Sequence, residues 1–109
     1  MSTNYDNSDD LLKKLTRDDF AVQVNTKFRF LQNSNWLEAE LIEVTPLKTT
    51  TRQEQFSLFF QMPKEFLPVQ GNYLFEHEKL GSTEIFIVPI EGTENDTIFQ
   101  AVFNRILPK

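Results

Sequence analysis

The single histidine of this sequence, His77, stands between two glutamates, Glu76 and Glu78. An imidazole flanked by carboxylates can bind a metal ion or transfer protons. Neighbouring side chains of a strand point to opposite faces, however, so we expect His77 to point away from both carboxylates and to share a face with Tyr73 and Phe75. The favoured interpretation is a histidine hydrogen-bonded to a turn at a strand end, with no catalytic or metal-binding role.

Other carboxylates offer weaker cases for chemistry. Glu38 and Glu40 share one face of a predicted strand, which allows paired-carboxylate glycosidase chemistry to be imagined. Neighbouring glutamates that simply lie on a solvent-exposed face are far more common than a catalytic pair of carboxylates. The segment Glu91–Asp96 offers hard oxygen ligands, but it lacks the alternating carboxylates and terminal glutamate of a calcium loop. We expect a solvated hairpin loop there, and the sequence leaves cation binding by this loop open.

Nucleophilic catalysis and phosphate binding have little support. Ser57 and Ser82 are the serines near predicted strands, and neither lies in a nucleophile-elbow motif. Three scattered glycines cannot form a phosphate loop, and the absence of cysteine excludes thiol nucleophiles, disulfides and thiolate metal sites. Arg52 and Arg105 border predicted strands, where we expect each to pair with Glu76 or with backbone carbonyls. We predict no catalytic residue, no cofactor and no metal site, and hence no enzymatic activity.

Length and charge narrow the class of protein further. The 109 residues correspond to one domain, and we expect a disordered tail over residues 1–8 followed by a single β domain over residues 9–109. Eleven basic and sixteen acidic residues give a net charge of −5, which disfavours nucleic acid and anionic membranes as partners. The longest apolar run, Ile85–Ile90, is far too short to span a membrane, and no secretory signal is visible. We therefore expect a cytoplasmic protein.

The elements that position these residues begin with short helical turns. Ser8 can cap a first helix, which would present an apolar face made of Leu11, Leu12 and Leu15. Thr16 and Asp19 have the spacing of a capping box, with Asp19 in place of the usual glutamate. Phe20 and the residue before Thr16 occupy the positions of a hydrophobic staple. The sequence thus predicts one or two helical turns packed against a sheet.

From residue 27 onward the hydrophobic pattern has a period of two, which is typical of strands. A strand that starts at Trp36 changes its apolar face after Leu41, which predicts either a β-bulge or a bend from one sheet into another. A polar loop is expected over Pro46–Arg52 and a helical turn over Lys64–Leu67. The predicted strands lie near residues 27–30 and over Trp36–Thr45, Gln55–Met62, Asn72–His77, Glu84–Ile90 and Thr97–Arg105.

About six strands with short connections predict antiparallel pairing, because parallel pairs need long crossovers. The predicted fold is all-β, either a small six-stranded barrel or a two-layer sandwich, with a short N-terminal helix. Eleven phenylalanines indicate an aromatic core, and Phe56, Leu58 and Phe60 share one face of their strand as predicted core residues. Gly81 can supply a positive φ at the turn after His77.

Five segments of the chain form a recognisable pattern in their order and spacing: Phe20…Val24–Phe28, Arg52…Phe56–Phe60, Tyr73–Gly81, Phe86–Ile90 and Ala101–Arg105. By this pattern the chain resembles a bacterial family of small β proteins classed as a domain of unknown function. The resemblance runs from about Leu15 to Arg105, and Asn25 stands where the family pattern has glycine, a change that a left-handed turn tolerates. It implies an association with phage-tail-collar or microcystin-dependent-type proteins, and no known activity.

Two aromatic residues stand out as candidate protein-binding residues. Phe59 lies on the face of its strand opposite the core residues, and Trp36 lies on the face that carries Glu38 and Glu40. Partly exposed aromatic side chains are typical anchors in protein interfaces. For Phe59, burial under the N-terminal helix is at least as good an interpretation. We therefore expect a protein partner or self-association, with Trp36 as the better candidate.

Two further functions remain as alternatives. A barrel with a hollow interior would bind a small ligand. An uncharacterised hydrolase is the weaker alternative. The interior of the barrel separates ligand binding from protein binding. A lined cavity favours a ligand, whereas a filled core with an exposed apolar patch favours a protein partner, such as a phage-tail-collar-like structural protein.

Overall fold

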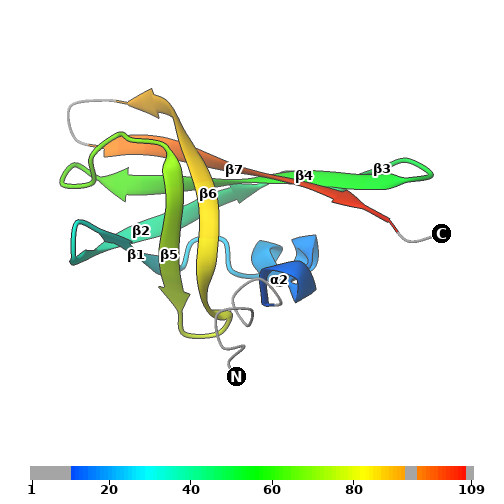
Figure 1. The fold of residues 1–109 in the computed structure, drawn as a ribbon, viewed down its shortest axis with the longest axis horizontal. Coiled ribbons are helices and arrows are strands. Elements are labelled where there is room, and N and C mark those ends of the chain that lie inside the picture. Colours follow the sequence, from blue (N-terminus) through cyan, green and yellow to red (C-terminus); the bar gives the residue numbers. More distant parts are fainter. Residues whose placement is uncertain (1–10, 93–95, 108–109) are drawn as a thin grey trace, which may run out of the picture.

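The computed structural model describes residues 11–92 and 96–107 and shows a mainly antiparallel β fold with two short helical segments (Figure 1). The predicted disordered tail and the Ser8 cap lie outside the described residues. Residues 11–14 are helical, and a second helix, α2, spans Arg17–Ala21. The strands are β1 (Lys27–Gln32), β2 (Asn35–Val44), β3 (Lys48–Thr49), β4 (Gln53–Pro63), β5 (Gly71–His77), β6 (Gly81–Gly92) and β7 (Asp96–Ile106).

Six of the strands close into a barrel. The sheet order is β2-β1-β5-β6-β7-β4-β3, and an additional pairing of β2 with β4 joins the two sides. The barrel thus consists of two three-stranded meanders, β1-β2-β4 and β5-β6-β7, which meet at the β4–β7 and β1–β5 pairs. The predicted choice between barrel and sandwich is settled in favour of the barrel.

β3 is an addition to the predicted strands. It lies inside the segment expected to be a polar loop, where Lys48 pairs with Gln55 and Thr49 with Glu54. Threonine favours extended backbone, and a tight turn closed by the Thr50 N–H to the Gln53 carbonyl at 2.8 Å returns the chain into β4. Together with the ends of β4 and β7, β3 forms an arm that extends beyond the barrel (Figure 1).

The connection between β4 and β5 also differs from the prediction. Residues 64–67 do not form a helical turn. Phe66 instead closes a hydrogen-bonded turn by donating its N–H to the carbonyl of Pro63 at 3.0 Å. The proline at position 68 disfavours helical backbone at the residue before it, which explains why no helix forms. The turn places Phe66 in the core, where it is 1% exposed.

Positive φ angles lie where the chain reverses. Asn33 and Ser34, with φ of 50° and 69°, form the two-residue turn between β1 and β2. Asn25 has φ of 74° before β1, so it takes the left-handed conformation that the sequence analysis allowed for this asparagine. Gly81 has φ of 96° at the start of β6, which confirms the predicted role of this glycine.

The predicted change of face in β2 is a β-bulge. Leu41 pairs with Phe60 and Glu43 with Phe59, so Ile42 is the extra residue between them. The bulge turns the later apolar residue Val44 to the same side as Leu41, opposite the buried Leu58. A second bulge, between Pro89 and Glu91 in β6, was not predicted.

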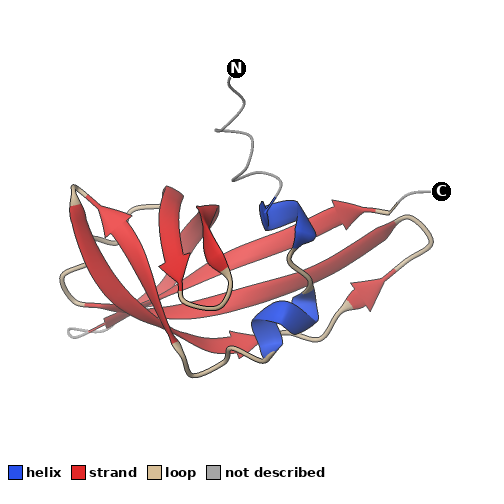
Figure 2. Cartoon of the chain, turned by 90° about the horizontal axis from the view of Figure 1, so that it is seen from below, coloured by secondary structure: helices blue, strands red, loops and turns tan. Residues whose placement is uncertain are grey.

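The helical segments lie beside the barrel (Figures 1 and 2), where α2 packs against β2 and the carbonyl of Leu12 accepts a hydrogen bond from Arg105 of β7. α2 begins with the predicted capping box: the Asp19 N–H donates to Thr16 Oγ1 at 3.1 Å, and the Thr16 N–H donates to Asp19 Oδ2 at 2.9 Å. Both staple residues, Leu15 and Phe20, are buried. The ring of Phe20 lies 5.5 Å from that of Phe103, so α2 contributes directly to the core.

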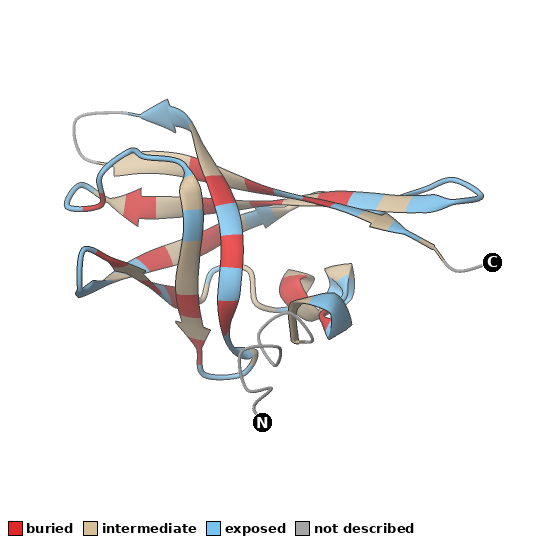
Figure 3. Ribbon diagram, in the orientation of Figure 1, coloured by how far each residue is buried: buried red, intermediate tan, exposed pale blue. Residues whose placement is uncertain are grey.

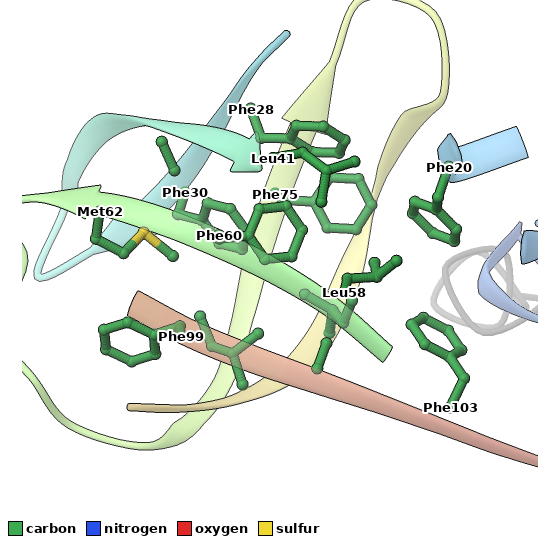
Figure 4. Close-up of a cluster of buried hydrophobic side chains, with 14 of the residues drawn as sticks. Phe20, Phe28, Phe30, Leu41, Leu58, Phe60, Met62, Phe75, Phe99 and Phe103 are labelled. Atoms are coloured by element: carbon green, nitrogen blue, oxygen red, sulfur yellow. The ribbon is translucent and has the colours of Figure 1, made fainter. Parts of the chain in front are cut away.

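Buried and exposed positions alternate along the strands (Figure 3), and the barrel interior is filled with aromatic side chains (Figure 4). Phe60 lies at its centre, with the rings of Phe28 and Phe30 each 5.1 Å away in edge-to-face geometry. Phe66 and Phe99 make a similar contact at 5.3 Å. The predicted core positions Phe56, Leu58 and Phe60 are all buried. Chains of ring contacts therefore occupy the space in which a barrel would hold a ligand.

Candidate protein-binding surfaces

Trp36 lies near the start of β2 with 37% of its surface exposed. The guanidinium of Arg29 on β1 sits 5.3 Å from the centroid of its ring, and Arg29 also forms an ion pair with Glu76 on β5. These contacts hold one side of the indole in place through a cation–π interaction. Trp36 is thus an exposed aromatic side chain that is positioned before any partner arrives.

A groove of about 460 Å³ opens beside this residue. Its floor includes Gln32, a polar residue that is 8% exposed. The Gln32 amide binds both backbone groups of Leu67: Nε2 donates to the Leu67 carbonyl at 3.1 Å, and Oε1 accepts the Leu67 N–H at 2.8 Å. We call this site the Trp36 groove, and its lining residues are Gln32, Asn33, Asn35, Trp36, Leu37, Glu65 and Leu67.

These two hydrogen bonds of the Gln32 amide fix the β4–β5 connection against the β1–β2 hairpin. As a result Leu67, which is 51% exposed, is held next to Trp36 along the same groove. The amide and carboxylate side chains of Asn33, Asn35 and Glu65 supply polar groups around the two apolar residues. This combination of an apolar centre with a polar border is typical of protein interfaces.

The second predicted binding residue, Phe59, lies elsewhere. It is half-buried on the outer face of β4, opposite Glu43 on β2 and Gln100 on β7. Glu43 is seven positions after Trp36 on β2, a separation of roughly 20 Å along the strand. The helix α2 packs against β2 and places Phe20 in the core against Phe56, which lies on the face of β4 opposite Phe59. The structure therefore does not bring Trp36 and Phe59 into one site.

A third outward-facing group was missed by the sequence analysis. Phe86 on β6 is 49% exposed, and Val102 and Ile106 on β7 are 56% and 79% exposed. Phe86 and Val102 line a groove of about 410 Å³ between the two strands, with Leu12 and Lys13 beside them. We call Phe86, Val102 and Ile106 the β6–β7 surface. The available signal was apolar residues on both faces of each strand, as in Ile85–Ile87 and Ala101–Phe103.

His77 has the structural role that the sequence favoured. It is 7% exposed, and its Nδ1 accepts the N–H groups of Lys79 and Leu80 at 3.0 and 3.2 Å. A nitrogen that accepts two N–H groups carries no proton, so the ring proton lies on Nε2, which contacts Thr26 Oγ1 at 2.9 Å. Thr26 Oγ1 in turn donates to the Gln23 carbonyl at 2.7 Å. One ring nitrogen thus holds the β5–β6 turn, and the other joins β5 to Thr26 before β1.

The protonation of His77 follows from this environment. Burial lowers the pKa of the imidazole below its ordinary value, and the positive charge of Lys79 lowers it further, while the carboxylate of Glu78 acts in the opposite direction. The ring is also packed 4.3 Å from that of Phe28. The neutral form is therefore the form that this site stabilises.

The predicted surface glutamates face basic residues on the neighbouring strand. Glu40 lies opposite Lys27, with 3.6 Å between Lys27 Nζ and Glu40 Oε1, and Glu38 lies opposite Arg29. Both glutamates point outward on β2, as predicted. The arrangement is a ladder of alternating charges across β2, β1 and β5, which stabilises strand pairing.

The arginine expectations need one correction. Glu76 pairs with Arg29 and not with Arg52 or Arg105, because Arg29 lies directly opposite Glu76 in the β1–β5 register. Arg105 does bind a backbone carbonyl, as the alternative expectation had it: its Nη2 donates to the carbonyl of Leu12 at 2.9 Å. It also lies 3.7 Å from Glu54 and stacks on Phe103.

The predicted loop Glu91–Asp96 is shorter than expected. Glu91 belongs to β6, Asp96 begins β7 and accepts a hydrogen bond from Gln61, and residues 93–95 lie outside the described residues. Over residues 11–92 and 96–107, no group of three or more His, Cys, Asp or Glu side chains is arranged to hold a metal ion. The described ends of this loop thus add no metal-binding group to the candidate surfaces.

The fold and surface together define the class of this protein: a small closed β-barrel with a packed aromatic interior. The chain belongs to the family described as Domain of unknown function (DUF6916), which it matches over residues 15–103. The predicted membership of a domain-of-unknown-function family is thus confirmed. No curated protein and no solved structure matches the chain. Within the part of the chain that the structure describes, neither helical segment has the length and apolar character to cross a membrane.

Proposed function

We propose that this barrel is a non-enzymatic protein-interaction module that binds a partner through the Trp36 groove. The observation that carries the proposal is the contrast between interior and surface. The interior is packed with phenylalanine rings in mutual contact, whereas Trp36 and Leu67 remain exposed along a groove of about 460 Å³. A ligand-binding barrel would need the space that the rings occupy.

The side chains around the groove support an interface role. Trp36 is held by Arg29, and Leu67 is held by the Gln32 amide, so little conformational freedom is lost when a partner binds. Preorganised aromatic side chains of this kind dominate the energetics of many interfaces. The only histidine uses one ring nitrogen to bind a turn and the other to contact Thr26, which supports a role without acid–base catalysis.

On the sequence resemblance alone, we further propose a cytoplasmic accessory role for a structural protein of the phage-tail-collar type. The net charge of −5 supports a protein partner over nucleic acid or an anionic membrane. Purification of the tagged chain from its native cell, followed by mass spectrometry of the bound proteins, tests this identity. Recovery of a partner from another class would contradict it.

The groove itself is tested by substitution. Trp36→Ala and Leu67→Ala should each weaken capture of the same native partner, because both remove apolar contacts at one site. Loss of a central tryptophan costs about 2 kcal/mol or more in many interfaces. Val22→Ala is the matched control, because Val22 is an apolar residue, 74% exposed, that lies outside the groove lining. Unchanged capture by both groove variants, at unchanged circular dichroism, would rule out this groove.

A further inference from the structure

The end of β7 is an open sheet edge. β6 pairs with β7 only between Val88–Gly92 and Thr97–Gln100. β4 pairs with β7 along its full length, as far as Ile106. Past Gln100, β6 turns away from β7 (Figure 1). The groove of the β6–β7 surface lies between the two strands there. Among the described strands, β7 therefore has a neighbour on one side only over residues 101–106.

The backbone groups on this open edge can be identified from the hydrogen bonds on the other side. The Leu107 N–H donates to the Arg52 carbonyl at 2.6 Å, in line with the β4–β7 register. Residues along an antiparallel strand alternate between bonding one neighbour and bonding the other. The N–H and C=O groups that point away from β4 are therefore those of Val102, Asn104 and Ile106.

The same three residues point their side chains to solvent. Val102 and Ile106 are 56% and 79% exposed, and Asn104 between them is exposed and uncharged. Natural edge strands are usually protected by charged side chains, proline or a bulge, because an open edge pairs with other strands. Residues 102, 104 and 106 of this edge have none of these protections, although Leu12 and Lys13 line the groove beside it. An exposed apolar edge of this kind is suited to pairing with a further strand.

We propose that the β7 edge pairs with β7 of a second copy of this chain, antiparallel about a two-fold axis at Asn104. The inference names a partner for the β6–β7 surface, and so it rests on the proposed interaction function. In this register Asn104 lies opposite Asn104 of the partner subunit, and Val102 lies opposite Ile106 of the partner subunit. Each of these pairs exchanges two backbone hydrogen bonds, and the exposed apolar side chains cover one another.

Two further observations favour a second copy over an unrelated strand. On the inner face, the two-fold places Phe103 opposite Arg105 of the partner subunit, a pair that already stacks at 5.1 Å within one chain. The groove beside the edge carries Lys13, Arg105 and Glu84, and Glu54 lies 3.7 Å from Arg105, so the edge is locally close to neutral on a chain of net charge −5. Two acidic copies therefore meet where their mutual repulsion is smallest.

The oligomeric state tests the proposal. By sedimentation velocity over a concentration series, the wild-type chain should reach twice its 12.8 kDa mass. Asn104→Pro removes the central N–H donor at a position where an edge strand tolerates proline, and should weaken the dimer about tenfold or more. Asn104→Lys places a charge against its own copy on the axis and should give the monomer. Gln55→Lys is the matched control. Gln55 lies directly opposite Asn104 on β4, which is on the side of β7 away from the proposed dimer contact.

Dimeric wild type and Gln55→Lys, with monomeric Asn104 variants of unchanged melting temperature, would support the proposal. A monomeric wild type at every concentration, or a dimer that survives both Asn104 variants, would overturn it. A chain lacking residues 1–10 that dimerises when the full chain does not would also overturn it, by showing that the edge is covered within one chain. If the wild type is monomeric while Trp36→Ala loses its partner, the proposed function stands and this inference fails.

Discussion

His77 joins the β5–β6 turn to the segment before β1 through hydrogen bonds of one ring. Its Nδ1 accepts two N–H groups of the β5–β6 turn, and its Nε2 contacts Thr26 before β1. Protonation of Nδ1 breaks both turn hydrogen bonds, and burial lowers the pKa of the ring. The folded state therefore binds this proton less readily than the unfolded chain does, so stability is lost as the pH falls below the unfolded pKa of about 6.5.

We predict that His77→Gln flattens this acid dependence. The melting temperature of the wild type should fall between about pH 7 and pH 5 more steeply than that of the variant, because only the wild type carries the buried imidazole. Thermal denaturation followed by circular dichroism across this range measures both. Parallel pH profiles for the two proteins would show that His77 does not contribute. The nearby Glu78 and Lys79 are unchanged in the comparison.

Gly81 holds the other end of the same turn. Its φ of 96° is strained for any side chain, and a Cβ there would lie 3.2 Å from Leu11 Cδ2. We predict that Gly81→Ala destabilises the protein by about 1–3 kcal/mol, mainly through backbone strain. Gly71→Ala is the matched control, because its nearest contact is 3.8 Å and its φ lies outside the left-handed region. Urea denaturation of both variants should separate them; equal stabilities would contradict the assignment.

At the scale of elements, the alternation of side chains along β4 and β6 decides which phenylalanines are structural. Phe60 is fully buried between Phe28 and Phe30, whereas Phe86 is 49% exposed on the outer face of β6. We predict that Phe60→Ala lowers the free energy of unfolding by about 3–5 kcal/mol. Phe86→Ala should cost less than about 1 kcal/mol. Similar losses for the two variants, measured by denaturant unfolding, would contradict the faces described here.

Several elements were predictable because their signals are local. The capping box at Thr16, the bulge after Leu41 and the positive φ of Gly81 each depend on a few neighbouring residues. β3 was missed because two residues of strand produce no periodic pattern, and it exists only through its pairing with β4. Residues 64–67 lack the predicted helical turn because the proline at position 68 disfavours helical backbone in the residue before it.

At the scale of the whole molecule, closure of the barrel was not predictable from periodicity. It depends on the pairing of β2 with β4 and on two residue pairs between β1 and β5, which join segments far apart in the sequence. A period of two shows that a strand has two faces, but not which strand lies beside it. The sequence therefore predicted either a barrel or a two-layer sandwich and could not decide between them.

The candidate surfaces were predictable only in part for a related reason. Trp36 was singled out because polar residues share its face of the strand, and the structure places it at a groove. Phe86 and Val102 lie in strands with apolar residues on both sides, so the sequence could not separate the outer face from the core. Their exposure follows from the divergence of β6 and β7, which is a property of the closed barrel.

The contact between Phe20 and Phe103 has a consequence for how the chain reaches this fold. Phe20 emerges early during synthesis, yet its ring partner lies on the last strand described, as does the pairing that completes β4. The core therefore cannot close until β7 has left the ribosome, and a nascent chain without it exposes unpaired strands to chaperones. Such non-local pairing is expected to slow refolding to the range of about milliseconds to seconds.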